Sequence, residues 1–360
     1  MSNSFDYTNL AVKMVCPDNV VVADDKDLPG IYVKRASKTL AQLLSTTDTS
    51  VHPAFKIGGE TKATLCFGKF QGKVDGSRLY SLPCEDPASY ITHDTIAQYC
   101  RNKGAGHHEI TAAEWAFLAL LAKKNGTKPK GNNNYGKDAS ETGYVAIPTY
   151  KDGNTTCRVA TGTGPLSWSD TGEINGIFDL NGNVWEWVIG IRLVKGELQV
   201  IPYNDAALPT TDLSAASSEW RAINAKATSW DNLFIVPDGS GTTTNSVKLD
   251  YVSNHWQWQM AVITSASDSS RNAAFANTTI AADVSAFAAL YLRTMALAPE
   301  EGDTDYDGDI FWANNGAAER CAVRGGGWAY GANGGVFALG FSYARSGSGA
   351  SVGGRPAFYE

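Results

Sequence analysis

The last part of the sequence lacks the residues on which most enzyme and metal chemistry depends. From Arg324 to Arg355, a span named the C-terminal segment, there is no Asp, Glu, Lys, His or Cys. Nucleophiles, general acids and metal ligands come mainly from these residue types, so the segment is not expected to hold a catalytic centre. It holds 11 of the 36 glycines of the chain, a density that argues against ordinary core strands because glycine weakens a strand interior.

Three further absences narrow the class of protein. The 360-residue chain has no block of Lys or Arg and a formal net charge of −7, so neither nucleic acid nor an anionic membrane is expected as a partner. Its longest apolar run, residues 116–122, is far too short to span a bilayer, and no membrane insertion is expected. The first six residues lack the basic and apolar regions of a secretory signal.

The cysteines also lack a recognisable pattern. None of the six forms a Cys-x-x-Cys pair, which excludes the usual zinc and redox spacings. We therefore predict buried free thiols, because an unpaired cysteine behaves as a small hydrophobic residue. Disulfides stay an alternative if the protein acts outside a cell. The six residues are Cys16, Cys66, Cys84, Cys100, Cys157 and Cys321.

The C-terminal segment is rich in Gly, Ser, Ala and Tyr. Tyrosine provides rigid contact area and serine provides adaptable hydrogen bonds, and binding loops favour both among glycines. Composition therefore predicts a surface that displays side chains to a ligand. A glycine-rich tail that only completes a sheet is the alternative. We interpret Arg324, Arg345 and Arg355 as scaffold residues that bind backbone carbonyls or carboxylates beneath this surface.

Two helices have clear start signals ahead of this segment. The first covers residues 92–103, with Thr92 as its N-cap. The second covers residues 112–124, where Thr111 and Glu114 have the capping-box spacing. Both helices would contribute to a core of mixed helix and strand composition.

A tryptophan-rich strand is predicted after the turn at Asn181-Gly182. Alternation places Trp185 and Trp187 on one face and Glu186 on the other. Large aromatic residues dominate buried area, so both tryptophans are interpreted as core residues.

The chain is predicted to be of α+β class with two parts. Residues 1–50 read as a small N-terminal appendage for attachment or oligomerisation, bounded by the polar run 45–50. Residues 51–360 form the main domain, with an insertion at about 203–300 that is rich in Ser, Thr, Asn and Ala.

Two short motifs are candidates for a metal site. Acidic residues at alternating positions followed by a glycine resemble the start of a calcium-binding loop. The position of the usual bidentate glutamate is Asn314, however, and the alternative is a solvated acidic turn. The adjacent His107 and His108 are interpreted as structural, because neighbouring side chains diverge. The acidic residues are Asp303, Asp305, Asp307 and Asp309.

Three motifs together resemble a known family. They look like the signature of the formylglycine-generating-enzyme (sulfatase-modifying-factor) branch of the C-type lectin fold, over residues 52–360 apart from the insertion. The motifs are residues 108–116 (HEITAAEWA), 181–187 (NGNVWEW) and 324–328 (RGGGW). The resemblance implies a C-type-lectin-like domain with an insertion. The enzymes of that branch carry a reactive cysteine pair near the position of Arg345-Ser346, where this chain has none, and Cys321 lies too early to replace it. Oxidase activity is therefore not expected.

A second branch of the fold matches better. The segment is similar to the variable proteins of diversity-generating retroelements, in which adenine-directed mutagenesis rewrites Asn codons in a variable region, here residues 324–357. Such changes give Ala, Tyr, Gly or Ser but not Lys, Glu, Gln, Met or Trp, and none of the latter occurs at the positions between the frame residues. The resemblance implies ligand contacts at Ala329, Tyr330, Ala338, Gly340, Ser342, Tyr343, Gly347, Gly349, Ala350 and Ser351. Gly354, where the family usually has Phe, is a departure.

This resemblance implies a binding protein without catalytic residues or a cofactor. The expected function is receptor binding by a phage tail protein that decides host tropism, made in the bacterial cytoplasm and carried on the virion. The expected partner is a protein or glycan of the host-cell surface, and a homotrimer is one assembly that such proteins adopt. A bacterial cell-surface adhesin of the same fold is the alternative, and a formylglycine-generating-type oxidase is a third, less favoured one.

Overall fold

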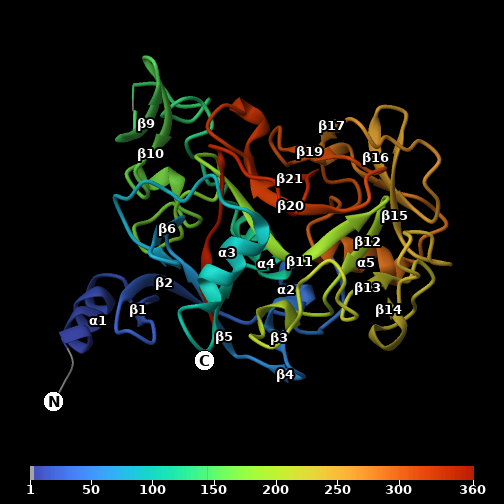
Figure 1. Cartoon of the computed structure of the whole chain (residues 1–360), viewed down its shortest axis with the longest axis horizontal. Coiled ribbons are helices and arrows are strands. Elements are labelled where there is room, and N and C mark those ends of the chain that lie inside the picture. Colours follow the sequence, from blue (N-terminus) through green and yellow to red (C-terminus); the bar gives the residue numbers. More distant parts are fainter. Residues whose placement is uncertain (1–3, 144) are drawn as a thin grey trace.

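The computed structural model describes residues 4–143 and 145–360, so residues 1–3 of the predicted appendage lie outside it. Helices and strands alternate irregularly and the strands form sheets, which confirms the α+β class (Figure 1). The α-helices are α1 (Ser4–Val15), α2 (Leu40–Leu43), α3 (His93–Arg101), α4 (Ala112–Lys124) and α5 (Ala286–Thr294). Short 3₁₀ turns lie at η1 (Pro53–Phe55), η2 (Leu166–Trp168), η3 (Asp205–Ala207), η4 (Trp230–Asn232), η5 (Phe275–Asn277) and η6 (Gly331–Asn333).

A large sheet carries the C-terminal segment. Its path runs β17 (Arg271–Ala274), β19 (Ile310–Ala313), β21 (Gly335–Tyr343), β20 (Arg320–Gly325), β11 (Trp185–Val194), β12 (Glu197–Val200), β15 (Lys248–Val252), β16 (His255–Gln259), β18 (Thr279–Ile280). Three short strands attach beside this path: β13 (Arg221–Ile223), β14 (Phe234–Ile235) and β22 (Val352–Gly353). The segment therefore does form interior strands, and the expectation from its glycine content was wrong. Most of its glycines lie in the turns around β21, whose interior carries only Gly340 between its first and last residues.

A second, five-stranded sheet joins the two ends of the chain. Its order is β1 (Asn19–Ala23), β2 (Pro29–Ala36), β5 (Thr64–Gly68), β23 (Pro356–Phe358) and β8 (His107–Glu109), with all neighbours antiparallel. Strands β1 and β2 were predicted to belong to a separate appendage, and that boundary is a correction. Strand β2 pairs with β5 of the main domain, and this pairing buries Tyr32 and Val33. Leu40, which follows β2, is buried as well.

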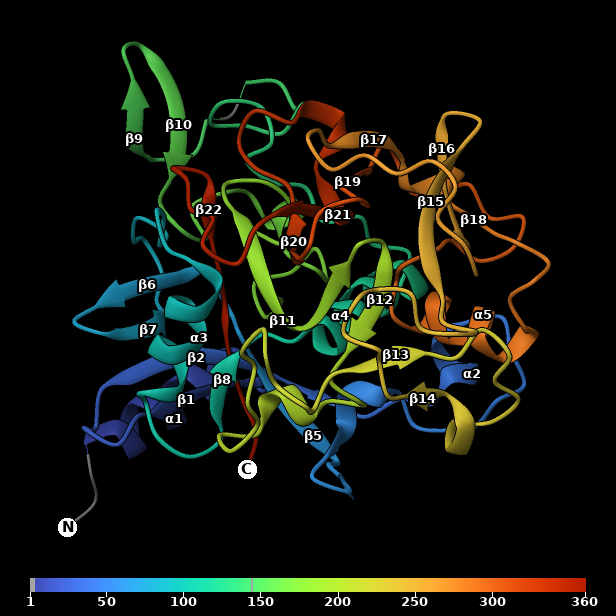
Figure 2. The same cartoon turned by 45° about the vertical axis from the view of Figure 1, so that its right-hand side comes forward.

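Three two-stranded hairpins complete the described strands. They are β3 (Lys56–Ile57) with β4 (Glu60–Thr61), β6 (Gly72–Asp75) with β7 (Arg78–Ser81), and β9 (Pro148–Asp152) with β10 (Thr155–Val159). In both views the β9–β10 hairpin projects at the upper left and β21 lies in the upper half of the molecule, while α1 and β1 lie at the lower left (Figures 1 and 2).

Helix α4 is the centre of the core, as its sequence predicts. Thr111 accepts a hydrogen bond from the backbone N–H of Glu114 at 3.1 Å, and the Glu114 carboxylate accepts one from the backbone N–H of Thr111 at 3.0 Å. This capping box fixes the start of the helix. The indole of Trp115 then donates to the Val336 carbonyl at 2.8 Å, so the helix is tied directly to β21.

The region predicted as an insertion extends the large sheet on the β12 side. It supplies the strands from β13 to β18 together with α5. Within the described residues, no helix is long and apolar enough to cross a membrane.

Candidate binding surface

A buried ion pair joins two of the sequence motifs. Arg355 lies at the end of the C-terminal segment, and its Nη2 and Nε atoms donate to the two carboxylate oxygens of Glu186 at 2.7 and 2.9 Å. The remaining guanidinium nitrogen, Nη1, donates to the Gly68 carbonyl at 2.9 Å. Both side chains are fully buried. This bidentate geometry fixes the end of the segment against β11.

Arg324 holds the start of the segment in a similar way. Its Nη2 atom donates to the carbonyls of Met295 and Ala296 at 3.2 and 3.0 Å, where helix α5 ends. Burial lowers the pKa of Arg324 to about 9, and a cation at the carbonyl end of a helix is favoured by the helix dipole. The prediction that Arg324 and Arg355 are scaffold residues is confirmed.

Glycines make the turn that lifts the chain out of β20. Gly325 and Gly326 have φ values of 89° and 87°, in the left-handed region that other residues rarely adopt. A Cβ atom on Gly326 would lie 2.8 Å from the Cα atom of Gly334. Only glycine allows these two stretches of backbone to approach, so the RGGGW motif is a structural requirement of the turn.

Eight of the ten predicted contact positions lie at the surface or are half-buried. These eight are named the contact positions: Ala329, Tyr330, Ser342, Tyr343, Gly347, Gly349, Ala350 and Ser351. Ala338 and Gly340 are corrections, because both are buried in β21 between β19 and β20. A Cβ atom on Gly340 would lie 2.8 Å from Val323, so a larger residue there would press into the sheet.

The two tyrosines among the contact positions pack against the tryptophans of β11. Tyr330 meets Trp185 edge-on, with ring centroids 5.1 Å apart, and Tyr343 meets Trp187 at 5.7 Å. Burial raises the pKa of Tyr343. Each ring therefore presents one part to solvent and packs the other on the core. Replacement of either tyrosine is therefore expected to lower the stability of the fold.

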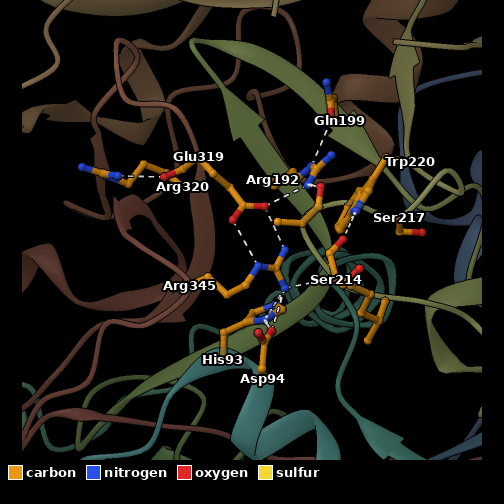
Figure 3. Close-up of polar contacts among 12 residues, drawn as sticks. His93, Asp94, Arg192, Gln199, Ser214, Ser217, Trp220, Glu319, Arg320 and Arg345 are labelled. Atoms are coloured by element: carbon orange, nitrogen blue, oxygen red, sulfur yellow. Dashed lines mark hydrogen bonds and ion pairs between the residues drawn. The ribbon is translucent and has the colours of Figure 1, made fainter. Parts of the chain in front are cut away.

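Arg345 anchors the loop that carries the last contact positions (Figure 3). Its guanidinium donates to both carboxylate oxygens of Glu319, at 3.1 and 2.9 Å, and to Asp94 in α3 at 2.7 Å. It also donates to the Leu213 carbonyl at 2.9 Å. The scaffold interpretation is confirmed for this arginine too.

Glu319 is shared with a second arginine. Arg192 of β11 donates to it at 2.9 Å and lies over the Trp220 ring, with its guanidinium carbon 4.2 Å from the ring centroid. Burial alone would raise the pKa of Glu319, but the hydrogen bonds and charges of Arg345 and Arg192 outweigh it and lower the pKa. The Glu319 carboxylate thus links β11, the start of β20 and the loop between β21 and β22 (residues 344–351), which is called a display loop because it carries contact positions.

The acidic motif lies beside the start of β21, and lysines meet its carboxylates. Lys123 pairs with Asp303 at 2.9 Å, and Lys128 pairs with both Asp305 and Asp307. In the part of the chain that the structure describes, no group of three or more His, Cys, Asp or Glu side chains is placed to hold a metal ion. In the candidate calcium loop, lysine ammonium groups therefore pair with the carboxylates that would have to share a calcium ion.

Asp309, the last acidic residue of the motif, is buried. It accepts a hydrogen bond from the backbone N–H of Phe337 at 2.7 Å, and burial raises its pKa to about 8 from 3.8. Because the pKa is higher in the folded than in the unfolded state, the protonated form is favoured by folding. That stabilisation is complete below about pH 4 and is lost as the pH rises toward 8.

We expect Asp309→Asn to flatten this pH dependence. The amide imitates the neutral carboxyl and its oxygen still accepts from Phe337, so the variant should lose less stability than the wild type between pH 5 and pH 8. Urea unfolding of both proteins at the two pH values measures the difference. Parallel loss in both proteins would show that Asp309 does not titrate in this range.

The cysteine and histidine motifs are structural. All six thiols are free, and all are buried except that of Cys84. Burial raises the pKa of Cys321 to about 12, which removes the thiolate that a nucleophile needs. His108 contacts the buried Glu114 at 2.8 Å, and burial lowers the pKa of His107 to about 3.

Sequence reasoning missed aromatic residues that surround the contact positions. Trp312 pairs in register with Gly340 across β19 and β21 and is half-buried. Tyr150 lies 6.4 Å from Trp328 between ring centroids. Trp312 lies in β19 and Tyr150 lies in β9, and nothing in their local composition marks them as neighbours of the segment.

No family model matches this chain, and no curated protein matches it either. Among solved structures, PvdO from Pseudomonas aeruginosa is 11% identical with a TM-score of 0.36, over 95% of this chain and 98% of that one. The Major Tropism Determinant U1 variant is 11% identical with a TM-score of 0.31, over 94% of this chain and 71% of that one. Both similarities are weak, so the function of this chain has to be inferred from its own residues.

Proposed function

We propose that this protein binds a partner on a cell surface through the contact positions, as a receptor-binding protein of a phage tail. The observation that carries the proposal is the division of the C-terminal segment into two kinds of residue. Arg324, Arg345 and Arg355 are held by carboxylates and carbonyls of other elements, whereas the contact positions carry small or aromatic uncharged side chains that are exposed or half-buried. A rigid scaffold allows such side chains to change without unfolding the core.

The same division supports retroelement diversification in a C-type-lectin-like domain. The contact positions hold Ala, Tyr, Gly and Ser, the residues that altered Asn codons give, and the paired Ala329-Tyr330 and Ser342-Tyr343 fit adjacent codons. Gly354, the departure from the family pattern, has a local cause: a Cβ atom there would lie 2.0 Å from a carboxyl oxygen of Glu109. A side chain at position 354 would therefore collide with the Glu109 carboxyl group.

The proposed activity is binding without catalysis or a cofactor. Cys321 is the cysteine nearest the contact positions in sequence, and its burial argues against the oxidase alternative. A bacterial adhesin would use the same surface, so this alternative differs from a phage protein only in where the protein is carried. Detection in purified virions supports the phage tail, and detection on a cell envelope instead supports the adhesin.

The DNA beside the gene tests the retroelement part of the proposal. A near-copy of the C-terminal segment with Asn codons at the contact positions is expected next to a reverse transcriptase gene. Absence of both from the flanking DNA would remove diversification from the proposal while leaving ligand binding in place.

A displayed library tests whether the contact positions determine binding. We expect variants of Ala329 and Ala350 to Ser or Tyr to change the free energy of unfolding by less than about 0.5 kcal/mol, as surface substitutions usually do. Tyr330→Ala should cost more, about 1–2 kcal/mol, because its edge contact with Trp185 is lost. Thermal unfolding measures these stability changes. Selection of the library for cell binding measures whether the same substitutions change binding. Binding that stays unchanged across the library would contradict the proposal.

A further inference from the structure

Two tyrosines outside the C-terminal segment stand exposed at its border. Tyr90 is 65% exposed and Tyr135 is 47% exposed. Both have a φ of 53°, in the left-handed region that non-glycine residues rarely adopt. Residues held in such conformations concentrate at functional sites, where the surrounding structure imposes them.

The main chain of each tyrosine is bonded to a different part of the segment. The backbone N–H of Tyr90 donates to the Gly349 carbonyl at 2.9 Å, and that of Tyr135 donates to the Trp328 carbonyl at 2.8 Å. These two carbonyls belong to the two display loops, one before β21 and one after it. Each tyrosine is therefore placed by the loop that it borders, and its ring remains available to a ligand.

Exposed aliphatic residues continue the surface beyond Tyr135. Val145 and Ile147 are 58% and 59% exposed, and between them the backbone N–H of Ala146 donates to the Gly136 carbonyl at 2.8 Å. This stretch leads into the β9–β10 hairpin, which projects at the upper left of the molecule (Figure 2). Exposed apolar residues that lie next to one another mark interaction sites more often than scattered ones do.

The charges at the base of this region are already paired. Arg158 of β10 donates to both carboxylate oxygens of Asp86 at 2.9 Å, and to the Ala350 carbonyl at 3.0 Å. Its guanidinium carbon lies 4.6 Å from the centroid of the Tyr150 ring. The arginine therefore supports the display loop and the hairpin. Val145 and Ile147 are exposed just before the hairpin, and Lys151 and Asp152 are exposed within it.

We propose that Tyr90, Tyr135, Val145 and Ile147 form a fixed half of the binding surface, and that the partner is a protein which presents apolar side chains. The inference rests on the proposed function and adds residues and a partner class to it. Branched aliphatic side chains have no hydroxyl or charge with which to bind a sugar, whereas tyrosine and aliphatic residues together are typical of protein interfaces. The contact positions can then vary beside a constant apolar anchor.

The available area agrees with a protein partner. A large aromatic side chain buries about 150–250 Å². The fixed residues together with Tyr330 and Tyr343 would supply several hundred of the about 800 Å² per partner that a standard interface buries. The small contact positions around them would contribute the remainder.

Selection with two probes tests the partner class. The full-length protein is immobilised and offered a phage-displayed random peptide library, and in parallel it is applied to an array of bacterial surface glycans. We expect peptides with an aromatic or aliphatic consensus to be enriched and the glycans to remain unbound. Binding of glycans with no peptide enrichment would overturn the protein partner but not the proposed function.

Variants then test the fixed residues with the enriched peptide as ligand. Tyr90→Gly and Tyr135→Gly should each weaken the Kd at least about tenfold, the loss expected of an interface anchor. Their Tm should be unchanged or raised, because glycine accepts the positive φ without strain. Tyr7→Ala is the matched control, since this tyrosine is 68% exposed on α1, and its Kd should not change.

The variants also separate the two hypotheses. Loss of binding in Tyr330→Ala and Tyr343→Ala with no loss in the two glycine variants would overturn the fixed half and leave the proposed function standing. Failure of both probes to bind the wild type, or peptide binding that no variant of either set weakens, would overturn both.

Discussion

Glu186→Ala is expected to lower the free energy of unfolding by about 3–5 kcal/mol, the cost of breaking a buried ion pair by removing one partner. The carboxylate of Glu186 lies 2.7 and 2.9 Å from the two donating nitrogens of Arg355 and also accepts from Gln71 at 3.0 Å. Without it, the guanidinium is buried with only neutral carbonyl partners. Urea unfolding followed by tryptophan fluorescence measures the loss.

A double-mutant cycle separates the pair from the rest of the core. Glu186→Leu combined with Arg355→Met replaces both charges by apolar groups, and we expect this double variant to lose less stability than the sum of the single variants. Glu85→Ala is the control, because its pair with Lys73 at 3.3 Å is solvent-exposed, and it should cost less than about 1 kcal/mol. Equal losses in Glu85→Ala and Glu186→Ala would show that Arg355 does not depend on its partner.

The sequence motifs predicted the scaffold well because their residues carry local or strongly constrained signals. The capping box at Thr111 and Glu114 is set by hydrogen bonds within four residues, so it can be read without knowing the fold. The size of Trp185 and Trp187 likewise predicted their burial, although β11 is buried along its whole length and Glu186 on the other face is buried too. The three arginines could be assigned to the scaffold because a planar fork with five donors suits a site rich in carbonyls.

Contacts between distant parts of the chain were not predictable in the same way. Strand β2 was assigned to an appendage because the polar run after it resembles a linker, yet β2 pairs with β5 in the folded chain. Ala338 and Gly340 have the same residue types as the exposed positions, and only the register of β21 shows that they are buried. Tyr90 and Tyr135 border the display loops through backbone hydrogen bonds, which leave no trace in composition.

Arg345→Ala is expected to cost about 2–4 kcal/mol and to loosen the display loop as well, since the variant leaves Glu319 without one of its two arginine partners. The guanidinium joins the loop to Glu319, Asp94 and the Leu213 carbonyl, and no other side chain of the loop has these bonds in the described structure. Amide hydrogen exchange in residues 346–350 should therefore become faster in the variant, while exchange in α4 should not.

Two further variants decide whether the effect comes from the geometry of this arginine. Arg345→Lys keeps the charge but cannot bind both oxygens of Glu319, so it should recover only part of the stability and protection. Arg320→Ala is the matched control, because Arg320 follows Glu319 at the start of β20 and donates to the Glu319 backbone carbonyl at 2.7 Å. It should leave exchange in the loop unchanged. If Arg345→Ala left loop exchange at the wild-type rate, rigidity would have to come from the glycine turns alone, and preorganisation of the contact positions by Arg345 would be wrong.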